Sequence, residues 1–486
     1  MSDRLARTLV FTTAAVVLVL EILAGRLLAP YLGLSLEVFT GIIGTVLAGI
    51  AVGAWAGGRA ADRYEPRVMV GPLLAAGGIL AMLAPPLVDA IGPTARAAGP
   101  AEILTVTGLA FFAPAAVLSA VSPIVVKIRL EDLANTGTVV GGYSAIGTAG
   151  AIFGTFATGF VLISAWPSRP IILVIGASLV IWGALMTVTA RNFRSLGLIA
   201  VPALLSAGLV TIVDGPCEVE TAYHCAFVTI DPGRPSGRIL WLDTLRHSYV
   251  DIEDPTHLEF RYSHVMTDVI DVQLPAGAID VLFIGGGGFT LPRYFPAARP
   301  GSTSTVLEID EELIDFVASE LALDRSDPAL TVRPGDARLL ITDEEPGSFD
   351  VVVGDAFGGL AVPWHLTTRE FTELVAEKLK PGGIYILNLI DNAPDRFASA
   401  ETATLQAVFA HVGVVAPAAF LERTSGGNFV LVGSNAPIHV AAVTAAIRFR
   451  EGREIILVDA GLDGFVAGAR LLTDDFAPVD QLLNRR

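Results

Sequence analysis

The stretch VLFIGGGGFTLPRY, residues 281–294, decides the fold of the second half of this chain. Its first four residues are apolar and predict a short buried strand, and Gly285–Gly288 predict a tight turn at the carboxyl end of that strand. The residues that follow predict a helix near 290–298. Because glycines let a ligand approach the backbone closely, this strand–turn–helix unit is a candidate binding site.

Strands and helices alternate along the rest of this half. Predicted strands are STVLEID (304–310), LTVRPGDA (330–337), FDVVVGDAF (349–357) and GGIYILNLI (382–390), and predicted helices are EELIDFVASEL (311–321) and TTREFTELVAEKL (367–379). This order is typical of a parallel doubly wound α/β sheet, a Rossmann-like fold. The pattern from about 217 to 275 is strand-like instead, and predicts a small β-strand subdomain before the sheet.

The ends of the first three strands carry the residues of a nucleoside site. Glu308 ends the second strand, where it can accept hydrogen bonds from ribose hydroxyls, and Gly335, Asp336 and Ala337 follow the third strand. Phe289 stands where a dinucleotide-binding motif has its last glycine, which disfavours a pyrophosphate-bearing cofactor such as NAD or FAD. The pattern therefore favours a nucleoside without phosphates, and S-adenosylmethionine is the obvious one.

The first half of the chain predicts an integral membrane bundle. The whole chain is 52% hydrophobic with a mean hydropathy of +0.61. Apolar segments of a length that crosses a hydrocarbon core of roughly 30 Å lie near 8–30, 38–58, 68–91, 102–126, 138–163, 170–189 and 196–213. Small residues recur through them, as in GGYSAIGTAGAIFGTFATG (141–159), and allow close helix packing in lipid. We therefore expect about seven helices over 1–213, the β-strand subdomain over 214–275, and the nucleoside-binding catalytic domain over 276–486.

Charge predicts the orientation of the chain in a cell membrane. The N-terminus and alternate loops carry the basic residues Arg4, Arg7, Arg59, Arg63, Arg67, Lys127, Arg129, Arg191 and Arg194. Basic loops stay in the cytoplasm, so seven crossings place the N-terminus inside and the soluble domain outside. Cys217 and Cys225 lie just beyond the last predicted span and favour a disulfide in an oxidising compartment. A metal site with His224, or two unpaired thiols, are the alternatives.

Several motifs together resemble one enzyme family. They are RILWLD (238–243), HLEFRYSHVM (257–266), the glycine loop itself, VLEID (306–310), GDAR (335–338), FDVVVGDAFGG (349–359) and LTDDFAPV (472–479). The chain resembles the spermidine synthase family of aminopropyltransferases, and most of all its membrane-fused branch. The resemblance implies that Glu308 holds the ribose and Asp336 the adenine amino group. It also implies that Asp355 is the acid at the reaction centre, and that Tyr262 lines the substrate cavity.

The chain departs from that family at the positions that would hold a diamine. Gly288 replaces the aspartate of the glycine loop, and Gly358 replaces a second acid three residues after Asp355. His247 and His264 occupy substrate positions that carry Gln and Glu in the family. Because each ammonium of a desolvated diamine needs a paired carboxylate, ordinary spermidine synthesis is not favoured unless Asp474 and Asp475 compensate. Capping or surface charge is the alternative role for those two aspartates.

These observations predict an enzyme in which an amine attacks a sulfonium carbon of S-adenosylmethionine or of its decarboxylated form, releasing methylthioadenosine. Asp355, Tyr262 and His247 are the candidate catalytic residues. Residues 214–486 carry 20 Lys and Arg against 40 Asp and Glu, which favours a cationic partner, a polyamine or S-adenosylmethionine itself, and argues against nucleic acid. No metal is expected, and a homodimer is one option for assembly. The alternatives are a methyltransferase and a nucleoside-sensing domain that gates a transporter-like bundle.

Overall fold

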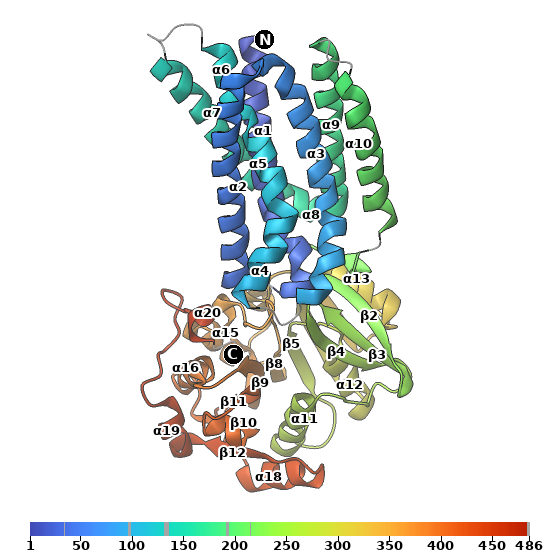
Figure 1. Ribbon diagram of the computed structural model, residues 1–486. Helices are drawn as coiled ribbons and strands as arrows, with labels where there is room; N and C mark the ends of the chain where they lie inside the picture. Colours follow the sequence, from blue (N-terminus) through green and yellow to red (C-terminus); the bar gives the residue numbers. More distant parts are fainter. Residues whose placement is uncertain (34, 96–98, 131–135, 191–193, 214, 484–486) are drawn as a thin grey trace. The chain divides into compact units, whose positions relative to one another are not determined.

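The computed structural model describes residues 1–33, 35–95, 99–130, 136–190, 194–213 and 215–483. The chain forms two compact units (Figure 1). The first comprises Met1–Phe227 and Leu242–Thr244, and the second comprises Val228–Trp241 and Leu245–Arg486. Arg191 and the side chain of Arg194, two of the basic loop residues, lie outside the described part.

The first unit is a bundle of long apolar helices. They are α1 (Asp3–Leu32), α2 (Leu36–Arg63), α3 (Pro66–Ile91), α4 (Pro100–Thr107), α5 (Ala113–Ser119), α6 (Val121–Arg129), α7 (Thr136–Ala157), α8 (Ile163–Ala165), α9 (Ser168–Thr189) and α10 (Arg194–Ile212). A π-helical turn, Gly108–Phe112, joins α4 to α5, and a second one, Thr158–Leu162, joins α7 to α8. Among the described residues, six helices are long and apolar enough to cross a membrane. The seventh predicted span falls on α10, whose apolar stretch Ile199–Ile212 is shorter, so the count of seven stays a prediction.

Helices in this unit pack through small residues, as the Gly- and Ala-rich segments predicted. A Cβ added at Gly150 of α7 would lie 2.2 Å from the carbonyl oxygen of Phe11 on α1, and one at Gly154 would lie 2.3 Å from that of Ala15. Real Cβ atoms do not come so close to a backbone oxygen, so α1 and α7 can approach this closely only with glycine at both positions.

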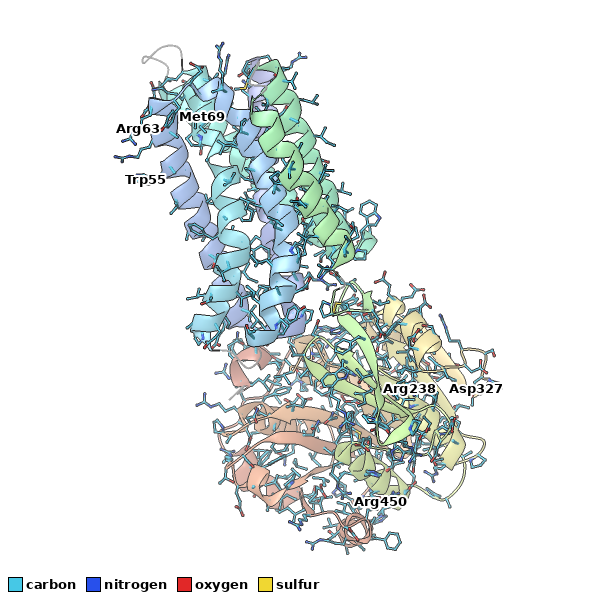
Figure 2. All side chains as sticks on the ribbon, turned by 45° about the vertical axis from the view of Figure 1, so that its right-hand side comes forward. Trp55, Arg63, Met69, Arg238, Asp327 and Arg450 are labelled. Atoms are coloured by element: carbon cyan, nitrogen blue, oxygen red, sulfur yellow. A yellow bond between two sulfur atoms is a disulfide. The ribbon has the colours of Figure 1, made fainter. Side chains whose placement is uncertain are left out.

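Large apolar side chains face outward from the same helices. Trp55 is 63% exposed, Phe160 77% and Leu204 75%. Trp55 points away from the neighbouring helices of the bundle (Figure 2). A water-soluble surface rarely carries so many large apolar groups.

The two ends of the bundle carry different polar groups. At the end with the N-terminus, Lys127 pairs with Asp62 (2.8 Å) and Arg129 lies 3.8 Å from Asp3. At the other end of α1, Arg26 donates to the carbonyl oxygen of Ala222 (2.8 Å). A disulfide joins Cys217 and Cys225 there, with a Cα–Cα distance of 5.1 Å, as the sequence predicted.

The last helix of the bundle returns to this disulfide-bearing end. The Nη1 atom of Arg169, at the start of α9, donates to the carbonyl oxygen of Val213, one residue past the end of α10 (2.9 Å). The guanidinium of Arg169 also pairs with Asp89 near the end of α3. α10 therefore ends at the end of the bundle where α9 begins.

The second unit contains the predicted α/β sheet. Its eight strands follow the order β12-β10-β11-β9-β8-β5-β6-β7, and they are β5 (Asp280–Ile284), β6 (Thr303–Glu308), β7 (Leu330–Pro334), β8 (Phe349–Gly354), β9 (Leu379–Asp391), β10 (His411–Pro417), β11 (Gly427–Ser434) and β12 (Glu454–Val458). Strands β7, β6, β5, β8 and β9 run parallel, and β11, β10 and β12 add antiparallel pairs. Predicted helices form α12 (Thr290–Ala298), α13 (Glu311–Glu320) and α15 (Arg369–Lys378).

A four-stranded sheet of order β1-β2-β3-β4 precedes it, formed by Val219–Glu220, Cys225–Asp231, Arg234–Leu242 and Leu245–Asp251. The expectation of strand throughout 217–275 was wrong for Arg261–Gln273, which is helix α11. Its apolar residues Val265, Met266, Val269 and Ile270 are all buried. They recur at a spacing of three and four, which is the period of a helix and not of a strand.

Candidate active site

The glycine loop forms a tight turn with positive φ angles. Strand β5 delivers Gly285 with φ +93° and Gly287 with φ +50°, and Phe289 follows at φ +59°. A Cβ at Gly285 would lie 2.6 Å from the carbonyl oxygen of Asp355. The loop therefore runs directly against the carboxyl end of β8, which is where ligands bind in sheets of this kind.

Glu308, at the end of β6, holds this loop in place. Its Oε2 accepts hydrogen bonds from the backbone N–H groups of Gly286 (2.7 Å) and Gly287 (3.2 Å), and its Oε1 accepts one from Asp310 (3.1 Å). The carboxylate is buried. Oε1 accepts only one of these hydrogen bonds and has a second lone pair, so Glu308 can still accept from a hydroxyl of a ribose beside the loop.

Asp336 and Ala337 lie at the end of the next strand, as predicted. Asp336 caps the short helix α14 (Ala337–Leu340) by accepting from the N–H of Arg338 (2.8 Å), and Ala337 is buried. The Nε2 atom of His365 lies 3.5 Å from Oδ1 of Asp336. Asp336 is partly exposed, so one of its oxygens is available to an amino group of a ligand.

Asp355 sits at the centre of a partly buried polar chain. Its Oδ2 accepts from the phenol of Tyr262 (3.2 Å) and its Oδ1 from Nδ2 of Asn388 (3.0 Å), whose own Oδ1 accepts from Nδ2 of Asn428 (2.9 Å). Burial raises the pKa of Asp355 to about 6, although the hydrogen bonds from Asn388 and Tyr262 act in the opposite direction. Burial and the neighbouring Asp355 raise the pKa of Tyr262 well above its usual value. A carboxylate poised near neutrality suits proton abstraction.

The two asparagines were missed from the sequence. Asn388 is a buried polar residue inside the apolar strand GGIYILNLI, and that contrast is a signal that could have singled it out. Asn428 lies on β11, which pairs with β9. In this pairing Val430 of β11 lies opposite Asn388 of β9. Because β11 follows β9 only after a helix and another strand, this contact could not be predicted locally.

Asp355 and Tyr262 open onto a cavity of about 390 Å³. Apolar side chains from α11, β9, β10 and β11 form much of its wall, and it is lined by Leu245, Arg246, His247, Phe260, Arg261, Tyr262, Val265, Asp355, Phe357, Gly359, Asn388, Ile390, Val415, Pro417, Phe420, Gly427, Asn428, Val430 and Glu454. A smaller cavity of about 30 Å³ adjoins the glycine loop and shares His247, Phe260, Tyr262 and Asp355 with the larger one. The two spaces thus meet at Asp355 and Tyr262, and one of them lies against the glycine loop.

His247 and Ser248 pack against the glycine loop. The Nδ1 atom of His247 lies 3.0 Å from Oγ of Ser248, and that Oγ accepts from the N–H of Gly288 (3.0 Å). A Cβ at Gly288 would lie 2.6 Å from Cβ of Ser248. Ser248 therefore fills the space that a loop aspartate would need.

Three predicted substrate residues lie elsewhere. His264, on α11, is not among the residues that line the cavity, and burial lowers its pKa. Asp474 pairs with Arg338, and its N–H donates to Glu370 (3.0 Å). Asp475 is exposed and lines neither of the two cavities. The structure therefore does not bring Asp474 and Asp475 to the acceptor side.

Replacing Tyr262 by phenylalanine should raise the pKa of Asp355. The phenol stabilises the ionised carboxylate, and losing one hydrogen bond of about 0.5–1.5 kcal/mol corresponds to roughly 0.4–1 pH unit. The acidic limb of the kcat/KM profile should move to higher pH by that amount in the Tyr262→Phe variant. If the acidic limb stays at the pH of the parent protein, Tyr262 does not donate a hydrogen bond to Asp355 in the working enzyme.

Comparisons with known proteins agree with this geometry. Residues 259–415 match the family model of the spermine/spermidine synthase domain, a range that includes Tyr262, the glycine loop, Glu308, Asp336 and Asp355. A polyamine aminopropyltransferase of Vibrio vulnificus is 25% identical over 246 residues, covering 48% of this chain and 79% of that protein. A putrescine N-methyltransferase of Nicotiana tabacum is 34% identical over 123 residues, covering 23% of this chain and 32% of that protein.

A solved structure and a further relative complete the comparison. The crystal structure of a probable spermidine synthase from Corynebacterium glutamicum has a TM-score of 0.50 and 28% identity, covering 54% of this chain and 96% of that one. A probable polyamine aminopropyl transferase of Bifidobacterium longum is 28% identical over 138 residues, covering 28% of this chain and 30% of that protein. The chain thus spans about a third of the length of two of these relatives.

Proposed function

Because this chain carries a domain of the spermidine synthase family, we propose that it is a transferase that moves an alkyl group other than methyl from a sulfonium nucleoside to an amine. The observation that carries the proposal is Asp355: a partly buried carboxylate beside the glycine loop that lines both cavities and whose pKa is raised to about 6. The substrate is S-adenosylmethionine or its decarboxylated form, held by Glu308 at the ribose and Asp336 at the adenine.

The chemistry requires little from the protein beyond position and a base. The amine lone pair attacks the carbon bonded to sulfur, the C–N bond forms as the C–S bond breaks, and the electron pair of that bond stays on sulfur. Methylthioadenosine leaves, and the proton of the attacking nitrogen passes to a carboxylate oxygen of Asp355. A positioned base contributes roughly 10²–10⁴-fold to such a step. Tyr262 and Asn388 hold the carboxylate toward the cavity.

Incubating the purified full-length protein with each sulfonium nucleoside, with and without putrescine, tests this function. Mass spectrometry should detect methylthioadenosine as the nucleoside product. Methyl transfer is the second candidate, because a putrescine N-methyltransferase is among the similar proteins, and it would give S-adenosylhomocysteine instead. Tight nucleoside binding without turnover would favour a sensing domain that gates the bundle.

The bundle is proposed to lie in the cell membrane, with the N-terminus in the cytoplasm and the soluble domain outside. The exposed apolar side chains of the helices support the bilayer. The basic loop residues Lys127 and Arg129 lie at the end of α1 that carries the N-terminus. The disulfide lies at the opposite end, and disulfides form in oxidising compartments outside the cytoplasm.

Cysteine labelling tests this orientation. The native cysteines are joined in a disulfide and do not react with a thiol reagent. The reagent therefore labels only a cysteine that is introduced, for example at the exposed position Ala441. In intact cells a membrane-impermeant reagent should label Ala441→Cys. It should label Glu65→Cys, at the basic end of the bundle, only after lysis. The reverse pattern would place the soluble domain in the cytoplasm.

A further inference from the structure

The larger cavity carries charges of both signs in its wall. Arg246 and Arg261 line it together with Asp355 and Glu454. Arg261 and Glu454 form a two-pronged ion pair, Nε to Oε1 at 2.8 Å and Nη2 to Oε2 at 2.9 Å. The pair raises the pKa of Arg261 and lowers that of Glu454, so both stay ionised near neutral pH. Glu454 is therefore already neutralised by a cation of the protein.

A diamine does not match this wall. It brings two ammonium groups, and each needs a carboxylate when it leaves water. Asp355, whose described partners Asn388 and Tyr262 are both neutral, can take one of them. For the second ammonium, Glu454 would have to leave Arg261. Of the other predicted substrate acids, Asp474 pairs with Arg338, and Asp475 is exposed and lines neither of the two cavities.

The space beside Gly288 holds no acid either. Ser248 fills the space next to Gly288, so the propylamine ammonium of a decarboxylated sulfonium would meet a hydroxyl there and not a carboxylate. The acids that line the small cavity are Glu259 and Asp355, and Glu259 lies beside Arg246 (3.3 Å) and His257 (3.8 Å).

Arg246 is placed to receive a carboxylate. Its guanidinium stacks over the rings of Phe260 (5.0 Å) and Tyr249 (5.6 Å), which fixes its plane at the cavity wall. Its Nη2 donates to Glu259 over a long 3.3 Å, and both side chains are more than a third exposed, so this ion pair is weak. A ligand carboxylate can replace it, since a planar guanidinium binds carboxylates by two parallel hydrogen bonds.

We propose, on the basis of the proposed function, that the cavity binds the α-amino-carboxylate end of an amino acid and not a diamine. Arg246 holds the carboxylate, and Asp355 takes the proton from the amine. The amine lone pair forms the new C–N bond, the C–S bond breaks with its electrons on sulfur, and methylthioadenosine leaves. The amino acid is either the methionine end of intact S-adenosylmethionine, which then closes a ring on itself, or a separate amino-acid acceptor.

Four reaction mixtures with the full-length protein separate these possibilities. They contain S-adenosylmethionine alone, S-adenosylmethionine with a mixture of amino acids, decarboxylated S-adenosylmethionine with the same mixture, and decarboxylated S-adenosylmethionine with putrescine. If S-adenosylmethionine without any addition releases methylthioadenosine, the substrate itself is the amino acid. If release needs an added amino acid, that amino acid is a separate acceptor. Fastest release with putrescine would overturn the inference and leave the proposed function standing. Failure of every mixture to release methylthioadenosine would overturn both.

Arg246→Gln tests the role of the arginine. Losing hydrogen bonds from a charged donor costs about 1.5–3 kcal/mol, so KM for the carboxylated substrate should rise roughly 10–150-fold, with a smaller change in kcat. The affinity for methylthioadenosine, which has no carboxylate, should stay unchanged and shows that the variant is folded. The matched control is Arg238→Gln, because Arg238 bonds to the carbonyls of Pro235 and Gly237 and does not line the cavity. An unchanged KM in Arg246→Gln would contradict the assignment.

Discussion

The Asp355→Asn variant should turn over about 10²–10⁴-fold more slowly than the parent protein, the range expected for loss of a positioned general base. Asparagine keeps the shape of the side chain and can still accept from Asn388 or Tyr262, but it cannot take a proton. Methylthioadenosine release under saturating substrate measures the effect. The affinity for methylthioadenosine should change little, because Glu308 and the loop that hold the nucleoside are intact.

The activity of the parent protein should also depend on pH through the ionisation of Asp355. The carboxylate works as a base only when ionised, and burial raises its pKa to about 6. Activity at limiting substrate should therefore rise as the pH increases through about 6, and Asp355→Asn should lose that limb. Asp463→Asn, the same change at an exposed position, is the control and should behave as the parent. Normal turnover of Asp355→Asn would remove Asp355 from the mechanism.

The Glu308→Gln variant should bind methylthioadenosine roughly 10–150-fold more weakly, which corresponds to about 1.5–3 kcal/mol for hydrogen bonds to a charged group. The amide that replaces one oxygen cannot accept a hydrogen bond. Depending on which way the amide turns, the N–H groups of Gly286 and Gly287, or the N–H of Asp310, would therefore lose their acceptor. Both the loop and the ribose contact weaken. Titration calorimetry of the full-length protein measures the change.

Glu311→Gln is the matched control for this variant, since Glu311 is exposed in the first turn of α13 and only three residues away. Its affinity should equal that of the parent. Equal affinities of Glu308→Gln and Glu311→Gln would mean that the nucleoside does not rest on Glu308.

Local patterns predicted where the glycine loop, Glu308 and Asp336 lie in the fold. The glycine loop, Glu308 and Asp336 each sit directly after a strand whose apolar run is visible in the sequence, and parallel strands bring their carboxyl ends to one edge. The disulfide was predictable for a similar reason, because its two cysteines are only eight positions apart and a short hairpin closes between them.

The acceptor side was harder to predict, because it is assembled from distant segments. Asn428 reaches Asn388 across two strands that pair only in the folded sheet, and Glu454 meets Arg261 from 193 residues away. The antiparallel strands β10–β12 supply part of the cavity wall, and no local pattern revealed that their partners were β9 and each other. Asp474 illustrates the same limit: its sequence motif suggested a substrate contact, whereas Arg338, 136 residues away, takes its carboxylate.

Deuterium labelling tests the central claim most directly, because the two candidate reactions break different bonds to the same sulfur. The full-length protein is given S-adenosylmethionine, or its decarboxylated form, with three deuterium atoms on the methyl group. If the longer alkyl chain is transferred, the methyl stays on sulfur, and the nucleoside product is methylthioadenosine three mass units heavier than normal. Unlabelled S-adenosylhomocysteine, or its decarboxylated counterpart, together with a deuterated methyl group on the acceptor, would show that the protein is a methyltransferase and contradict the account.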